Sequence, residues 1–162
     1  MTGVPDFVDA VAGFATGVVV LTVRDGRDDL GTTVTSFMSV SLDPPLVVAG
    51  VATSSYLTEV LTRQPRWAAT VLSASQRALA GRFASEGRPS ARILLASTPH
   101  HRGEHSDALI PELGQFAIEC ETRQTIDAGD HTLFVAETLS TDYITQQQIP
   151  LIRVNRRYLE DN

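Results

Sequence analysis

Short runs of β-branched residues, separated by turn signals instead of helix-length segments, set the strongest limit on how this chain can fold. The run VVVLTVR, Val18 to Arg24, is typical of a strand because β-branched side chains pack well on a pleated surface. Asp25-Gly26 favours a tight hairpin turn, and Leu30 to Phe37 then forms a second predicted strand. This spacing predicts an antiparallel sheet or closed barrel with helices attached, not a doubly wound parallel sheet.

The remaining elements follow the same reading of the pattern. Further strands are expected over Pro45 to Ala52, Trp67 to Leu72, Phe116 to Arg123, His131 to Ser140 and Pro150 to Asn155. Helices are expected over Pro5 to Phe14, over Ser55 to Arg63, and from an S-x-x-Q capping box at Ser73 to about Ala84. The apolar run PLVVAGVA predicts a strand buried on both faces, and residues 85 to 108 are expected to be irregular.

Composition narrows the function classes. The 162 residues fit one domain, 1–162, and the net charge of −6 excludes a uniform basic surface for nucleic acid. No apolar run approaches the roughly 20 residues that a membrane helix needs. The N-terminus carries two acidic residues and no basic region, so a secretory signal is not expected. With one cysteine, Cys120, no internal disulfide can form, and a cytoplasmic protein is the expectation.

A hydroxyl-rich stretch, SFMSVSLDPPLVV from Ser36 to Val48, raises the first functional question. Thr33 and Thr35 share one face of the preceding strand, and the chain must turn before Pro44-Pro45. Hydroxyls and backbone amides in such a turn can hold a phosphate without a lysine, but the spacing alone favours an ordinary serine-rich turn. Ser55 leaves the same two alternatives, since it can cap the next helix or help bind an anion.

Four segments in order narrow these alternatives: TGVVVLTVRDG from Thr16, LGTTVTSFMSVSLDPPLVVAGVATSS from Leu30, SQRALAGRFA from Ser75 and GDHTLFVAE from Gly129. Together they resemble the flavin reductase-like, FMN-binding split-barrel family. The resemblance implies a mainly β protein with flanking helices, built as a six-stranded antiparallel Greek-key split β-barrel and usually a homodimer. It also implies an NAD(P)H:flavin oxidoreductase that supplies reduced FMN or FAD to a partner monooxygenase or halogenase.

The resemblance also assigns site residues. The isoalloxazine and ribityl chain would be lined by Thr33, Val34, Thr35 and Ser36. The phosphate would lie near Ser41 and Ser55 and would pair with Arg82, and Phe83 would sit beside the cofactor. His131 would approach the nicotinamide as the catalytic residue. Hydride transfer from NADH or NADPH to flavin N5 is the chemistry of the cofactors themselves, so no nucleophile or metal is required.

Two departures from the family pattern keep alternatives open. Thr70, in WAATVLSASQ, stands where family members often carry Asn, so one hydrogen bond is missing or different. Residues 89 to 109 do not match the usual segment. One alternative is therefore an oxidoreductase with bound flavin that acts on an organic biosynthetic substrate. Another is a non-enzymatic carrier of flavin or haem on the same fold.

Histidines and a cysteine complete the candidates. His100, His101 and His105, with Glu104, could ligate zinc if helical, but Pro99 and Gly103 favour an irregular solvated loop, so no metal site is predicted. Cys120 lies between Glu119 and Glu121, and we expect it to be a buried packing residue.

Overall fold

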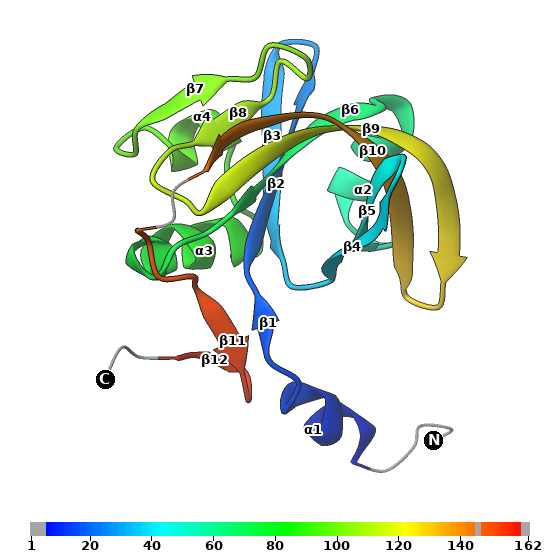
Figure 1. The fold of residues 1–162 in the computed structure, drawn as a ribbon, viewed down its shortest axis with the longest axis vertical. Coiled ribbons are helices and arrows are strands. Elements are labelled where there is room, and N and C mark those ends of the chain that lie inside the picture. Colours follow the sequence, from blue (N-terminus) through cyan, green and yellow to red (C-terminus); the bar gives the residue numbers. More distant parts are fainter. Residues whose placement is uncertain (1–5, 145–146, 160–162) are drawn as a thin grey trace.

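The computed structural model describes residues 6–144 and 147–159, and a seven-stranded antiparallel sheet dominates it (Figure 1). In spatial order its strands are β3 (Asp28–Val34), β2 (Val19–Asp25), β6 (Arg66–Val71), β9 (Phe116–Ala128), β10 (His131–Ile144), β5 (Pro45–Ala52) and β4 (Phe37–Leu42). The predicted mainly antiparallel class is confirmed. The turn between β2 and β3 contains Gly26 with a φ of 62°, as the Asp25-Gly26 signal predicts.

The two edge strands of the sheet are neighbours in the sequence. The predicted strand Leu30 to Phe37 ends at Val34, and only Thr35 and Ser36 separate β3 from β4. Because β3 pairs with β2 and β4 pairs with β5, one continuous stretch of chain forms the edge strands at both ends of a curled sheet. The strand count is therefore seven instead of six. No ladder joins β3 to β4 within residues 6–144 and 147–159, so the sheet there is not closed.

Alternating side chains of β2 supply two separate cores. Val19 and Leu21 join one core with helix α2 (Tyr56–Arg63), whose predicted apolar stripe of Leu57, Val60 and Leu61 is buried. Val18 and Val20 point the other way, toward a second core under helix α3 (Arg77–Ala84). Each face of the sheet thus carries a helix, α2 on one face and α3 on the other (Figure 1).

The capping box before α3 is confirmed. The backbone N–H of Ser73 donates to Gln76 Oε1 at 3.1 Å, and the short 3₁₀ helix η1 (Ala74–Gln76) leads directly into α3. The helix ends at Ala84, as predicted.

Residues 85–115 contain more order than their sequence predicts. They form helix α4 (Ala91–Leu94) and a small hairpin of β7 (His100–Arg102) and β8 (Leu109–Pro111). Asp29 of β3, whose residue is 1% exposed, accepts hydrogen bonds from Arg92 Nη2 at 2.7 Å and Arg102 Nη1 at 2.8 Å. This buried carboxylate therefore attaches the segment to the edge of the main sheet.

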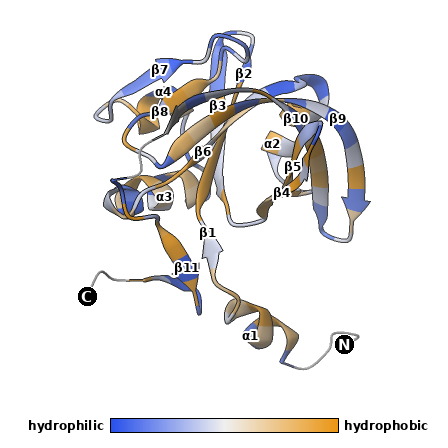
Figure 2. Cartoon of the chain, in the orientation of Figure 1, coloured by the Kyte–Doolittle hydropathy of each residue, from blue (hydrophilic) through white to orange (hydrophobic). Residues whose placement is uncertain are grey.

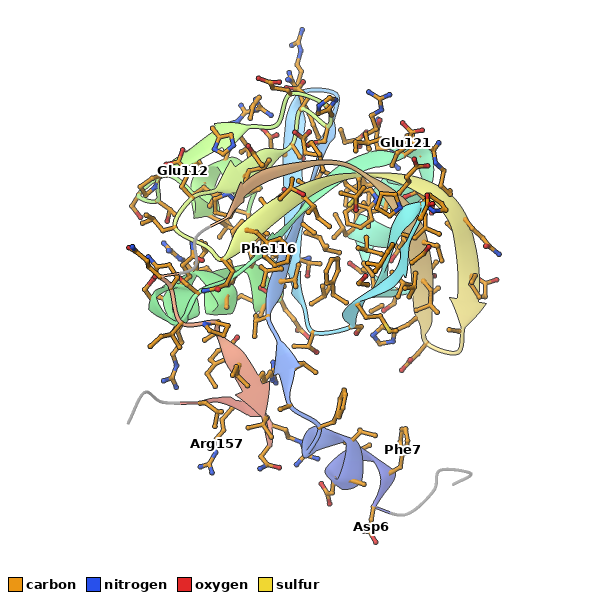
Figure 3. The ribbon with its side chains drawn as sticks, viewed as in Figure 1. Asp6, Phe7, Glu112, Phe116, Glu121 and Arg157 are labelled. Carbon is orange, nitrogen blue, oxygen red and sulfur yellow. The ribbon has the colours of Figure 1, made fainter. Side chains whose placement is uncertain are left out.

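The N- and C-terminal elements form an arm below the sheet (Figure 1). It contains helix α1 (Phe7–Ala12) and a three-stranded sheet of β1 (Thr16–Gly17), β11 (Ile152–Val154) and β12 (Arg157–Tyr158). The predicted apolar side of the first helix exists but is not buried, because Phe7, Val8, Val11 and Phe14 are all exposed. Figure 2 shows this apolar character on α1, and Figure 3 shows Phe7 on the arm, apart from the sheet.

Candidate functional site

A cleft of about 420 Å³ opens where β3 passes into β4, a volume typical of small-molecule sites. Thr35 and Ser36 border it on one side, and the ends of β5 and the start of β10 border it on the other. The full wall consists of Thr32, Thr33, Val34, Thr35, Ser36, Gly50, Val51, Ala52, Ser54, Ser55, Glu86, Arg88 and His131. Six of the nine sequence-predicted residues meet here: Thr33, Val34, Thr35, Ser36, Ser55 and His131.

Gly50 holds the two sides of the cleft close together. Its N–H donates to the carbonyl of Ser36 at 2.7 Å. A Cβ at this position would lie 3.0 Å from Ser36 Cβ and 3.3 Å from Leu133 Cδ2, so a larger residue would push the link away from β5. The bend at Thr35 and Ser36 depends on this close approach.

His131 begins β10 at the edge of the cleft, opposite Ala52 of β5. Its Nδ1 lies 2.8 Å from Asp130 Oδ1, and its side chain is 43% exposed. This hydrogen bond lowers the pKa of Asp130. The carboxylate therefore orients the imidazole ring and leaves Nε2 for another partner.

Two of the predicted hydroxyls already have local hydrogen bonds. Ser55 Oγ accepts from the N–H of Leu57 at 3.3 Å, which confirms Ser55 as the N-cap of α2. Thr33 Oγ1 donates to the carbonyl of Ala80 at 2.7 Å. Ser55 therefore keeps its O–H to donate to a ligand, whereas the O–H of Thr33 is already used and its oxygen can only accept a further hydrogen bond.

Three predicted residues lie outside this cleft. Ser41 is half-buried on β4, beyond the residues that form the wall. Arg82 is exposed on α3. Phe83 is fully buried in the core beneath α3, so its ring supports the site from below and does not face it.

Arg88 is the cation that sequence reasoning missed. Its Nε donates to the carbonyl of Gly31 at 2.6 Å, which directs the half-buried guanidinium to the cleft. Burial lowers its pKa. In the sequence, Arg88 is simply an arginine between Gly87 and Pro89, in a segment without periodicity. Nothing in that pattern distinguishes Arg88 from the other arginines.

Thr70 lies away from the cleft. It is buried on β6, and its hydroxyl has no hydrogen-bond partner among residues 6–144 and 147–159. The departure from the usual Asn therefore affects the interior of the sheet, not the wall of the site.

The histidines of the 85–115 segment have separate partners. His100 Nδ1 lies 2.7 Å from the carbonyl of Thr98, and His101 bridges Asp142 and Glu112 at 2.5 and 3.2 Å. The bonds to the two carboxylates outweigh the effect of burial and raise the pKa of His101. Across the described part of the chain, no group of three His, Cys, Asp or Glu side chains is arranged to hold a metal. Cys120 is buried, as predicted, and burial raises its pKa to about 12.

The wall of the cleft fits a flavin. Ala52 offers apolar surface beside the buried side chains of Val34 and Val51, and the hydroxyls of Thr32, Thr35 and Ser36 can bond to a polyhydroxyl chain. Ser54 and Ser55 precede the N-terminus of α2, and Arg88 adds the positive charge for a terminal phosphate. The wall contains one arginine, Arg88, one acid, Glu86, and many hydroxyls, so Arg88 is the cation that can meet the anionic end of a largely neutral ligand.

Comparison with known proteins supports the same ligand class. An FMN reductase (NADH), SmoA, from Agrobacterium fabrum is 38% identical over 135 residues, covering 82% of this chain and 73% of the relative. An NADH-dependent FAD reductase from Streptomyces globisporus is 36% identical over 127 residues, covering 78% of this chain and 69% of the relative. The solved flavin reductase of styrene monooxygenase from Pseudomonas putida S12 superimposes with a TM-score of 0.82 at 30% identity, covering 96% and 97% of the two chains.

Within the described residues, no helix is long and apolar enough to cross a membrane.

Residues 11–160, almost the whole chain, match the sequence profile of the flavin reductase like domain. The match includes the strand-to-strand link, the serines before α2 and His131, all of which meet at the cleft. This protein belongs to the flavin reductase-like family.

Proposed function

We propose that this protein is an NADH-dependent flavin reductase that supplies reduced FMN or FAD to a separate monooxygenase or halogenase. The observation that carries the proposal is the cleft, which gathers six predicted flavin-site residues from distant parts of the chain. Relatives that are named NADH-dependent reductases support the choice of nicotinamide, and relatives that serve a monooxygenase or a halogenase support the partner class.

The chain acts mainly by positioning. A bound flavin supplies the redox chemistry, because it accepts a hydride from a nicotinamide without help from a protein nucleophile. Ala52, with the buried Val34 and Val51 behind it, would border the ring, and Thr35 and Ser36 would hold its orientation. Correct alignment of two bound rings can supply several kcal/mol of the barrier reduction.

His131 contributes at the edge of the cleft. Asp130 holds its Nδ1, so Nε2 is the ring nitrogen left to bond to a nicotinamide at this edge of the cleft. From there it orients the nicotinamide carboxamide by a hydrogen bond. Arg88, and not Arg82, takes the role of phosphate partner, since Arg88 lines the cleft.

The assembly follows from the exposed surfaces. We expect one flavin reductase-like domain over 1–162, in which a six-stranded Greek-key split barrel is extended by β4 as a seventh strand. A homodimer buries the apolar side of α1 and the exposed side chains Met38, Val40 and Leu42 of β4. A cytoplasmic location remains a prediction.

Anaerobic stopped-flow absorbance at the oxidised-flavin band tests the activity. Purified protein is mixed with FMN or FAD and then with NADH or NADPH. We expect rapid, protein-dependent bleaching with NADH. Flavin that binds but does not bleach with either nicotinamide would contradict the proposal and favour an organic substrate instead.

A further inference from the structure

The far end of β10 has a strand beside it on one side only. Among residues 6–144 and 147–159, β5 pairs with β10 as far as Glu137, whereas the pairing of β10 with β9 continues to Ile144. The β7–β8 hairpin lies beside the end of β10 (Figure 1), and His101 of β7 makes the contact, with its Nε2 2.5 Å from Asp142 Oδ2. A side-chain contact therefore stands where the earlier part of β10 has a second strand.

A β-bulge in β10 aims Asp142 at this imidazole. The residues on either side of it, Thr141 and Tyr143, pair with consecutive residues of β9, so Asp142 is an extra residue in the strand. Bulges turn a side chain out of the regular alternation of a strand and recur where a side chain has a particular task. The result of this bulge is a carboxylate directed to the hairpin.

A second carboxylate faces the other ring nitrogen. His101 Nδ1 lies 3.2 Å from Oε1 of Glu112, the residue that follows β8 and that Figure 3 labels. The backbone of Glu112 is fixed by other contacts, because its carbonyl accepts from Gln76 Nε2 at 2.6 Å and its N–H donates to the carbonyl of Pro99 at 2.8 Å. Glu112 therefore stays with the hairpin, and the end of β10 is the part that can separate.

These contacts require a charged imidazole. An ionised carboxylate only accepts hydrogen bonds, and a neutral imidazole has a single N–H, so His101 can bond to both carboxylates only as the doubly protonated ring. The hollow around the ring is lined, within the described chain, by Glu112, Leu113 and Asp142. The nearest charged neighbour on β7, Arg102, is paired with Asp29 instead.

We propose that His101 is a pH-sensitive clasp, which holds the end of β10 against the β7–β8 hairpin while the ring is protonated and loosens when the ring loses a proton. Either neutral form weakens the hold on Asp142. With the proton on Nε2 the hydrogen bond loses its charge assistance, and with the proton on Nδ1 a nitrogen lone pair faces the carboxylate. The clasp is separate from the flavin cleft and does not require the proposed function.

The direction of the pH dependence follows from the same groups. Burial alone would lower the pKa of His101, but the hydrogen bonds and charges of Asp142 and Glu112 outweigh it and raise the pKa. A raised pKa in the folded protein gives stabilisation that is fully present below the unfolded-state pKa, about 6.5, and is lost as the pH rises through the folded-state pKa. The clasp is therefore closed at about pH 6 and loosens toward about pH 9.

Amide hydrogen exchange of the native protein at about pH 6 and about pH 9, expressed as protection factors, tests the clasp. We expect the protection of residues 138–142 to fall by at least about threefold across this range, as the loss of a partly exposed ion pair requires. Residues 131–137 of the same strand lie between β9 and β5, so they are the internal control and should keep their protection.

Two variants identify the titrating group. His101→Gln carries no charge, so its residues 138–142 should be weakly protected at both pH values and show no pH dependence. His100→Gln is the matched control, because His100 Nδ1 contacts the carbonyl of Thr98, and it should keep the native pH dependence. Titration of the His101 ring by NMR is a second readout that needs no change at His101, and Asp142→Asn should lower its midpoint.

Three results would each overturn the clasp. The first is native protection of residues 138–142 that stays constant between the two pH values. The second is a His101→Gln protein that keeps the native pH dependence, since another group would then control the end of β10. The third is a His101 midpoint that Asp142→Asn does not change. Flavin binding enters none of these measurements, so failure of the proposed function would leave them unaffected.

Discussion

At the scale of single residues, Gly31 explains why Phe83 belongs to the core and not to the site. A Cβ on Gly31 would lie 2.7 Å from Phe83 Cε1 and 2.8 Å from the carbonyl of Leu21. The missing side chain lets α3 pack directly on β3, and the next loop then returns Arg88 to bond with the carbonyl of Gly31. The absence of a side chain at Gly31 therefore allows the Phe83 ring to pack against β3, and the carbonyl of Gly31 holds the Arg88 side chain.

Arg88 and His131 should separate binding from chemistry. We expect Arg88→Gln to weaken flavin binding by about tenfold, because a partly buried charge-assisted contact to phosphate is lost. His131→Ala should instead slow NADH-driven flavin reduction by at least about tenfold while changing flavin affinity less than threefold. Titration with flavin and stopped-flow reduction at saturating flavin measure the two effects.

Equal losses of affinity and rate in His131→Ala would remove the proposed orienting role. Unchanged flavin affinity in Arg88→Gln would remove the arginine from the phosphate position. Arg82→Gln serves as the matched control, since Arg82 lies outside the cleft and its loss should alter neither measurement.

At the scale of elements, the 85–115 segment depends on Asp29. The carboxylate accepts from both Arg92 and Arg102, and Ser90 Oγ also donates to the carbonyl of Asp29 at 3.0 Å. Burial alone would raise the pKa of Asp29, but the two guanidinium groups outweigh it and hold the pKa below its usual range. This anchor positions the loop that carries Arg88, so it acts on the site through the backbone.

Asp29→Asn should lower the free energy of unfolding by about 2 kcal/mol at neutral pH. The substitution removes the buried negative charge that pairs with two partly exposed arginines. A depressed pKa in the folded state gives stabilisation that is present above the unfolded-state pKa, roughly 3.9. The difference between native and variant should therefore shrink as the pH falls below about 4. Urea denaturation at several pH values measures it, with exposed Asp127→Asn as the control.

A variant as stable as the native protein at neutral pH would show that the arginines do not depend on Asp29. Amide hydrogen exchange gives a second readout, because the amides of residues 88–108 should exchange faster in Asp29→Asn if this carboxylate is their anchor.

At the scale of the whole molecule, the exposed apolar side chains gather on the arm and on the edge strand β4. Phe14 is 76% exposed and Leu42 is 90% exposed. An edge strand with apolar side chains and a helix with an uncovered apolar side are unfavourable in a monomer. Since Thr35 lines both the flavin cleft and a groove beside α1, a second copy on this surface would lie next to the site.

Leu42→Asp should convert a homodimer into a monomer, because a charge at the interface costs more than the small loss of apolar surface. Size-exclusion chromatography with light scattering measures the mass of native and variant protein. Ile93→Asp, at another exposed apolar position on α4, is the control and should leave the mass unchanged. A native protein that is monomeric at micromolar concentration would contradict the prediction.

The sequence by itself determined the local elements and predicted the chemical class of the site. The bounds of β5, the N-cap at Ser55 and the capping box at Ser73 depend on neighbours within a few residues, so their patterns could be interpreted directly. The hydroxyl-rich link and His131 were recognised through the resemblance of their order along the chain. Each of these features is encoded either by residues that are close together in the sequence or by the order of motifs along the chain.

Only the tertiary structure decided the break at Thr35 and Ser36, the anchor at Asp29 and the position of Arg88, not Arg82, in the wall of the cleft. Each depends on groups that are distant in sequence: Ser36 meets Gly50, Asp29 meets Arg102, and Arg88 meets Gly31. No periodicity records such contacts, because their partners lie on different elements and meet only when the chain folds. The physical reason is that strand and helix propensities act along the chain, whereas the cleft forms between segments that the fold brings together.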